Sequence, residues 1–230
     1  MKLVEQGGNG LETLAKRFRY AFEAVKIDRS VSKPHIGLVG EIFVRSNQFT
    51  NDFIVRKLEA LGAECSLPPF EEWIHYIDYQ RRRRYRLERD WKGYAKQKLT
   101  ERFQEKAADQ LRQQFDGALR YFSHELPTSE VLTRGCTYLS DEIEGEAILS
   151  MGRAVEYAEH GFSGVVNVMP FGCMPGTIAS SLFHQFRNRH DGLPVFNLVV
   201  DGNRDPGQEV RLEAFFHQCC RQRTVPQNHK

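Results

Sequence analysis

The stretch that decides the fold is 165-VVNVMPFGCMPGT-177. Its first five residues are mostly apolar and β-branched, as expected of a short strand that is covered on both faces. Pro170 and Gly172 end this strand, and Pro175 suits the first turn of a helix, where its missing N–H costs nothing. We therefore expect Cys173 between the carboxyl end of a strand and the N-terminus of a helix. Ligands bind at such positions in open α/β sheets, and the helix dipole there favours a thiolate.

Three other short apolar runs are expected to be strands of the same sheet. They cover residues 36–39, 63–67 and 195–200, and helical patterns occupy residues 47–62, 144–160, 175–189 and 208–221. Strands that alternate with helices form a parallel sheet with right-handed crossovers. The sequence therefore predicts an α/β fold with an open, parallel, doubly wound sheet of about four strands. The strand ends would gather four candidate residues at one edge: Glu41, Cys65, Cys173 and Asp201.

Two segments depart from this alternation. Residues 1–32 are interpreted as an N-terminal helical arm, with one amphipathic helix over residues 11–27. Residues 70–125 are charged and helical throughout, and we expect them to form a helical insertion in an α/β domain that spans residues 33–223. Residues 131–141 have no clear period, and a loop containing Cys136 is one interpretation. Residues 224–230 are interpreted as a polar tail.

A run of arginines lies inside the insertion, where residues 81–86 read RRRRYR. Such a run could bind the phosphate groups of a nucleotide, a coenzyme A or a nucleic acid. The alternative is a solvated helix surface, because acidic residues lie nearby and consecutive arginines fan out around a helix axis. The formal net charge of only +2 favours the second interpretation, so nucleic-acid binding is not expected.

The composition is that of a globular protein, with 40% hydrophobic and 27% charged residues among 230. No apolar run approaches the roughly 18 residues needed to span a bilayer, and the N-terminus has no apolar signal core. We expect a cytoplasmic protein that does not enter a membrane.

The five cysteines are odd in number and irregularly spaced, and none of them forms a CxxC pair. This pattern argues against a disulfide framework and against a self-contained zinc site.

Four short blocks carry a resemblance to a known family. They are GEAIL at 145–149, PFGCMP at 170–175, VDG at 200–202 and RLEAF at 211–215. In this order and spacing they resemble the dehydratase-like regions of the large CoA-substrate-specific enzyme activase fusion proteins. Those regions are related to the subunits of 2-hydroxyglutaryl-CoA dehydratase and benzoyl-CoA reductase. The resemblance covers most of the chain and is to the carboxyl-terminal portion of that architecture.

The resemblance implies a flavodoxin-like half-domain that helps to hold a [4Fe–4S] cluster. Cys173 matches the cluster cysteine of this half, whereas the other cluster cysteines of the family lie in a preceding, similar domain. The cluster is therefore expected to be shared with an upstream half or a partner subunit. The resemblance also implies an electron-transfer system that acts on acyl-CoA thioesters and is driven by an ATP-dependent activator.

The candidate cofactor-binding residues are Cys173, Gly172, Glu146 and Glu41, and Cys136 is a candidate further metal ligand. Each carboxylate could line the cleft as an acid, a base or a cluster-orienting group, or could serve its own helix as a structural cap. Cys173 itself could be a ligand, a small packed residue or a lone nucleophile. Gly172, Gly176 and Gly202 are interpreted as glycines that permit turns.

No catalytic residue is assigned from the sequence. Whether the chain is itself part of a radical acyl-CoA dehydratase or reductase-like system is left open. The alternative function is a cofactor-free α/β module that docks a partner without catalysis.

Overall fold

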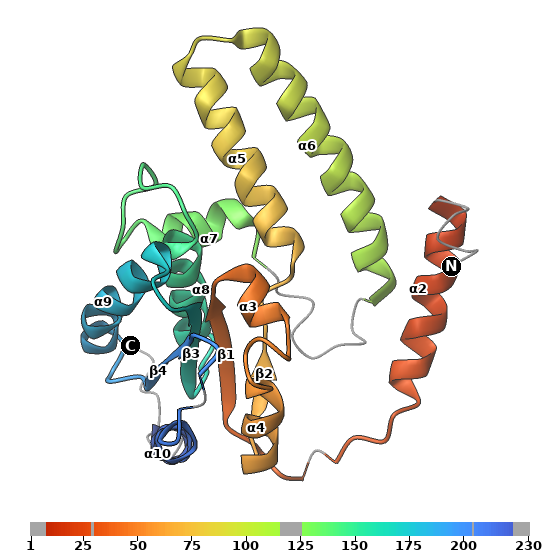
Figure 1. Ribbon diagram of the computed structural model, residues 1–230. Coiled ribbons are helices and arrows are strands. Elements are labelled where there is room, and N and C mark those ends of the chain that lie inside the picture. Colours follow the sequence, from red (N-terminus) through yellow and green to blue (C-terminus); the bar gives the residue numbers. More distant parts are fainter. Residues whose placement is uncertain (1–7, 29, 116–125, 204, 223–230) are drawn as a thin grey trace. The chain divides into compact units, whose positions relative to one another are not determined.

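The computed structural model describes residues 8–28, 30–115, 126–203 and 205–222 (Figure 1). The chain divides into two compact units. One comprises the described residues of Met1–Val31 and Ile74–Pro127, and the other those of Ser32–Trp73 and Thr128–Lys230. The tail expected at 224–230 lies outside the described residues. The second unit contains the sheet and is called the sheet unit below.

The sheet has four parallel strands in the order β2-β1-β3-β4. Their bounds are His35–Gly40 for β1, Glu64–Ser66 for β2, Gly164–Pro170 for β3 and Val195–Val200 for β4. This confirms the predicted open, parallel, doubly wound sheet with flavodoxin-like strand order. The chain moves from β1 to β2 on one side, and then crosses to β3 on the other side of β1. The strand order therefore reverses between β1 and β3.

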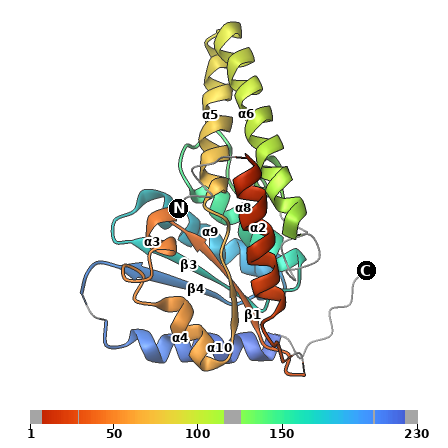
Figure 2. The same cartoon turned by 90° about the vertical axis from the view of Figure 1, so that its right-hand side faces the viewer.

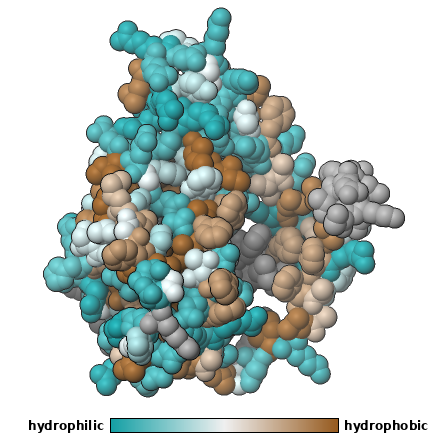
Figure 3. Space-filling view, in the orientation of Figure 1, coloured by the Kyte–Doolittle hydropathy of each residue, from teal (hydrophilic) through white to brown (hydrophobic). Residues whose placement is uncertain are grey.

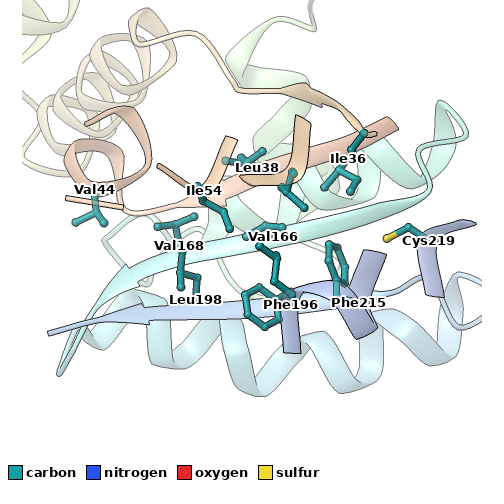
Figure 4. Packing of buried hydrophobic residues seen from close by; sticks show 13 residues of the cluster. Ile36, Leu38, Val44, Ile54, Val166, Val168, Phe196, Leu198, Phe215 and Cys219 are labelled. Carbon is teal, nitrogen blue, oxygen red and sulfur yellow. The ribbon is translucent and has the colours of Figure 1, made fainter. Parts of the chain in front are cut away.

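Helices cover both faces of this sheet (Figure 2). One face carries α4 (Ile54–Leu61) and α10 (Gln208–Gln222), and the other carries α8 (Ala147–Glu159) and α9 (Met174–Arg189). Figure 4 shows side chains of the first face, where Ile54 and Phe215 pack against Leu38, Val166 and Phe196 of the strands. Both faces of β3 are buried in this way, which is why its sequence is a nearly continuous apolar run.

The helix predicted over residues 47–62 is only partly correct. The structure has a short helix α3 (Ile42–Ser46), then turns, and α4 begins only at Ile54. The Asn51 amide donates to the carbonyl oxygens of Val44 and Arg45, both at 3.0 Å, and so satisfies groups at the end of α3. Asp52 and Phe53 then adopt positive φ angles of 54° and 53°, which a continuous helix does not allow.

Residues 131–141 do not form one loop. A helix α7 (Thr128–Gly135) comes first, and turns follow it from Cys136 onward. The helix packs closely on α8, because a Cβ added at Gly152 would lie 2.0 Å from the Val131 carbonyl oxygen. The periodicity of this segment is weak because the helix has only eight residues.

The other unit consists of helices. They are α2 (Gly8–Glu23), most of α5 (Glu71–Leu87), α6 (Trp91–Arg112) and the 3-10 turn η1 (Gln113–Phe115). The α5–α6 pair is joined by polar contacts, such as Gln97 Nε2 to Asp78 Oδ1 at 2.9 Å. Arg81 and Arg82 of the arginine run pair with Asp78 and Glu101 within this unit. Figure 3 shows a largely hydrophilic surface over the α5–α6 tip.

In the described part of the chain, no helix is both long enough and apolar enough to cross a membrane.

Gly40 ends β1, where it lies opposite Val168 of β3. Its φ angle is +112°, and a Cβ added there would lie 2.0 Å from the Val168 carbonyl oxygen of β3. Backbone geometry and space both require glycine at this position. Gly202 has a similar φ angle of +84° but open space around its Cβ position.

We expect Gly40→Ala to lower the free energy of unfolding by about 3–5 kcal/mol, because it adds a backbone clash to a strained φ angle. The matched control Gly202→Ala should cost only about 1–2 kcal/mol, since it meets the φ penalty alone. Urea denaturation of both variants measures the difference. Equal destabilisation by the two substitutions would show that the β1–β3 contact does not constrain the fold.

Candidate functional site

The carboxyl ends of β1 and β3 form the candidate site, because strand order reverses between them and crevices open at such points. Glu41 follows β1 directly, and its backbone N–H donates to the Val168 carbonyl oxygen of β3 at 2.9 Å. The segment from Pro170 to Cys173 follows β3. The structure therefore brings Glu41 and the Cys173 turn to the same edge, as the strand pattern predicts. The prediction is wrong for Cys65, which pairs with Ile36 near the opposite end of β1.

Glu41 is the N-cap of α3. Its carboxylate accepts hydrogen bonds from the backbone N–H groups of Phe43, at 3.2 Å, and Val44, at 2.7 Å. A carboxylate at this position satisfies otherwise unpaired donors and interacts favourably with the helix dipole. Of the two roles considered for Glu41, the contacts support the structural cap.

Glu146 lies beside Glu41 at the same helix end. Its Oε2 accepts a hydrogen bond from the Ile42 N–H at 3.0 Å, and its carboxylate also bonds the Trp73 side chain. Partial burial raises the pKa of Glu146 and the charge of Glu41 adds to this, while the Ile42 hydrogen bond and Arg45 oppose it. The first three N–H groups of α3 are thus occupied by two carboxylates of the chain itself.

A buried ion network holds this arrangement in place. Arg153 pairs with Glu72, and also with Glu156 at 2.7 Å, while Arg45 approaches Glu72 at 3.8 Å. The two arginines and two glutamates come from α3, the first turn of α5 and α8, and all four are buried. Burial raises the pKa of Glu72 and the two arginines oppose this. Removing any one partner would leave a buried charge uncompensated, which is strongly destabilising.

Cys173 is the N-cap of α9 and is half-buried. Its Sγ accepts a hydrogen bond from the Gly176 N–H at 3.4 Å, and its carbonyl oxygen accepts one from the Thr177 hydroxyl at 2.8 Å. Two apolar side chains flank the turn in the sequence and are mostly exposed, Phe171 by 76% and Met174 by 65%. The thiol therefore lies at a helix N-terminus, in a turn that also carries two exposed apolar residues.

The glycines around Cys173 have two different roles. Gly172 has a φ angle of +74° and open space at its Cβ position, so the prediction of a turn glycine is confirmed. The same interpretation of Gly176 is wrong. Gly176 lies in the first turn of α9, where an added Cβ would come within 2.5 Å of Met169 Sδ. It permits close packing of the helix on β3 rather than a turn.

The loop before α8 connects the carboxylates with the Cys173 turn. Gly145 has a φ angle of +118°, and a Cβ added there would lie 3.0 Å from Pro175 Cγ in the first turn of α9. The loop that carries Glu146 therefore contacts both α3 and α9. Within the described residues, however, no hydrogen bond or ion pair joins the Cys173 thiol to Glu41 or Glu146.

The structure does not link Cys136 to Cys173. Cys136 is exposed, and the residues after it contact the last turns of α9: Arg189 donates to the Thr137 carbonyl oxygen at 3.2 Å, and the Tyr138 and Phe186 rings are 6.1 Å apart. Cys173 caps the first turn of the same helix.

The remaining cysteines lie elsewhere. Cys65 belongs to β2, at the far side of β1 from β3, and Cys219 is buried under the sheet with Cys220 beside it on α10. In the ranges that the structure describes, no group of three or more His, Cys, Asp or Glu side chains could hold a metal ion. At this edge of the sheet, Cys173 is therefore the one cysteine that could donate a thiolate to a cluster.

Sequence reasoning missed the residues that support Glu146. Trp73, whose side chain bonds the Glu146 carboxylate, is distant from it in the sequence, and the Arg153–Glu156 pair belongs to the neighbouring buried ion network. A usable signal is the charged i, i+3 pair at Arg153 and Glu156 inside the otherwise apolar helix over 147–158, because buried charges need partners.

Comparisons of the chain with protein-family models, with curated proteins and with solved structures find no match in any of the three. The fold and the site define the class of protein: an open α/β protein of flavodoxin-like strand order, with a cysteine at its topological switch point.

We expect Glu146→Ala to lower the free energy of unfolding by about 1–3 kcal/mol, because the Ile42 and Trp73 donors lose their acceptor. Glu146→Gln keeps an acceptor and removes the charge, so its cost should be smaller. Since the folded-state pKa of Glu146 is raised, wild-type stability should fall relative to Glu146→Gln as pH rises from about 4.5 through that pKa. Unfolding curves at several pH values measure this. A stability difference that does not change with pH would contradict the raised pKa.

We expect the Cys65 thiol to react slowly with alkylating reagents in the native protein. Burial raises the pKa of Cys65 to about 12, with a contribution from Glu59, so at pH 8 only about one molecule in ten thousand carries the Cys65 thiolate. Alkylation of Cys65 by iodoacetamide, followed by peptide mass spectrometry, should accelerate about tenfold per pH unit above pH 8. Alkylation of native Cys65 at the rate found in the urea-unfolded chain would refute this prediction.

Proposed function

We propose that the chain supplies one ligand, the Cys173 thiolate, to a [4Fe–4S] cluster that it shares with a similar upstream half or a partner subunit. The single observation that carries the proposal is the position of Cys173, half-buried at the N-cap of α9 and at the switch point of the sheet. The cluster would supply one-electron transfer. The edge has no second thiol, so the remaining ligands would come from the other half.

The surroundings of Cys173 suit this role. The Gly176 N–H is a hydrogen-bond donor to Sγ, and donors to ligand sulfurs help to set cluster potentials. The dipole of the 16-residue helix α9 also stabilises negative charge at its N-terminus. Phe171 and Met174 would exclude water from the cluster once the other half covers them.

The carboxylates have a different part in this proposal. Glu41 and Glu146 hold α3 and the loop before α8, and so fix the edge on which Cys173 lies. They also occupy the first-turn donors of α3, and their negative charge opposes binding of phosphate groups at that helix end. The phosphates of an acyl-CoA would therefore have to be bound elsewhere, by the other half or by the insertion.

The wider system that we propose is electron transfer to an acyl-CoA thioester, driven by an ATP-dependent activator. Its support is the resemblance of the four sequence blocks to dehydratase-like regions of activase fusion proteins. All five cysteines are free thiols, which agrees with a reducing compartment such as the cytoplasm.

Anaerobic reconstitution tests the proposal. The full chain is incubated with ferric iron, sulfide and excess 2-mercaptoethanol, and is then desalted. The thiol reduces part of the iron to the ferrous state that the cluster also needs, and it can occupy the ligand positions that the other half would fill. We expect bound iron and sulfide with a visible charge-transfer band, reduced at least tenfold in Cys173→Ser. The matched control Cys220→Ser, in α10, should retain the wild-type amounts.

A second candidate is a cofactor-free module that docks a partner at the same edge. The exposure of Phe171 and Met174 favours it, because large apolar side chains at one turn suit an interface. It predicts that wild type, Cys173→Ser and Cys220→Ser retain equally little iron and sulfide. That result would reject the cluster proposal.

A further inference from the structure

The outer edge of β4 is a second feature of interest, and it is independent of the Cys173 site. β4 pairs with β3 on one side. In flavodoxin-like sheets a fifth strand pairs with the other side, but the sheet formed by the described residues ends at β4. An edge strand presents a row of unpaired N–H and C=O groups that can pair with another chain.

The register with β3 shows which groups face outward. The carbonyl oxygens of Pro194 and Val200 accept hydrogen bonds from β3 or the residue after it, at 2.9 and 2.8 Å. Because backbone groups alternate in direction along a parallel strand, the even-numbered residues of β4 face β3. The N–H and C=O groups of Val195, Asn197 and Val199 therefore point to the open edge.

This edge lacks the features that usually prevent strand pairing. β4 reads VFNLVV, with no charged residue and no proline, and it runs in continuous register with β3 without a bulge. Asn197 is exposed, and Val199 is 44% exposed. Natural edge strands commonly carry lysines, prolines or bulges that prevent association, so an unprotected edge of six residues indicates an occupant.

The outward residues are self-complementary. They read Val195, Asn197, Val199, which is the same sequence in both directions. A two-fold axis beside Asn197 would place Asn197 opposite its copy and Val195 opposite Val199 of the copy. In that antiparallel register every outward residue belongs to a hydrogen-bonded pair, and each such pair exchanges both N–H···O bonds.

The side chain of Asn197 is held in place by hydrogen bonds from β3 and α9. Its Oδ1 accepts hydrogen bonds from Asn167 Nδ2 at 3.0 Å and from the Ser180 hydroxyl at 3.1 Å. These two hydrogen bonds fix the orientation of the Asn197 amide. Asn167 is fully buried, so the anchor of Asn197 is part of the core.

We propose that β4 pairs antiparallel with β4 of a second copy of this chain, with the two-fold axis beside Asn197, so that two four-stranded sheets become one continuous sheet. A second copy is the occupant that the palindrome favours, because an unrelated strand would not require Val–Asn–Val symmetry. The two edges also carry no charge, so no repulsion opposes their pairing.

The test is the oligomeric state of the full chain by sedimentation velocity over a range of concentrations. We expect a wild-type dimer. Val199→Lys should raise the dimer dissociation constant about tenfold, because it places an ammonium group opposite Val195 of the copy at two symmetric positions. The matched control is Val210→Lys in α10, where the valine is 68% exposed, and this variant should dimerise like wild type. Far-ultraviolet circular dichroism shows whether both variants are folded.

Hydrogen exchange keeps the proposal testable if Val199→Lys does not fold. In wild type, the amides of Asn197 and Val199 should exchange more slowly as concentration rises, whereas those of Phe196 and Leu198 should be protected at all concentrations. The proposal is overturned by a wild-type monomer, by protection of the edge amides in a monomer, or by equal dissociation of the two lysine variants. Association of this edge with a different protein, while the chain alone stays monomeric, would also overturn it.

Discussion

The close approach of β1 and β3 at their carboxyl ends is the constraint on which the rest of the structure depends. Gly40 allows it, because any side chain there would meet the Val168 carbonyl oxygen. The approach brings the first turn of α3 next to the end of β3, and it sets Glu41 to cap that turn. The loop before α8 then adds Glu146, and its contact with Pro175 reaches the turn that holds Cys173.

The charges of the sheet unit follow from this arrangement. Two carboxylates lie at one helix N-terminus, where the N–H groups of α3 compensate their charge, and the neighbouring network balances two buried arginines with two buried glutamates. The thiol at the other helix N-terminus has a single N–H donor and no carboxylate partner among the described residues. Of Glu41, Glu146 and Cys173, Cys173 is therefore the one whose side chain is left for a ligand or a partner.

The sheet can be predicted from the sequence because the residues of β3 and of the turn after it determine their own conformation. The apolar run before Pro170 and the glycine at 172 determine where the strand ends and therefore where Cys173 lies. The five-residue helix α3 escapes prediction because it is too short for a periodic pattern and depends on capping by Glu41 and Asn51. The role of Glu146 is not predicted from the sequence either, because its hydrogen-bond donors Ile42 and Trp73 are distant from it in the sequence.

The central claim is that Cys173 donates its thiolate to an iron–sulfur cluster at the β1–β3 edge. The most direct measurement is a crystal structure of the anaerobically reconstituted chain, with anomalous diffraction data at the iron absorption edge. The account predicts anomalous iron density at bonding distance from Cys173 Sγ, beside the first turn of α9. Iron bound at other cysteines, with Cys173 Sγ still accepting only the Gly176 N–H, would contradict it.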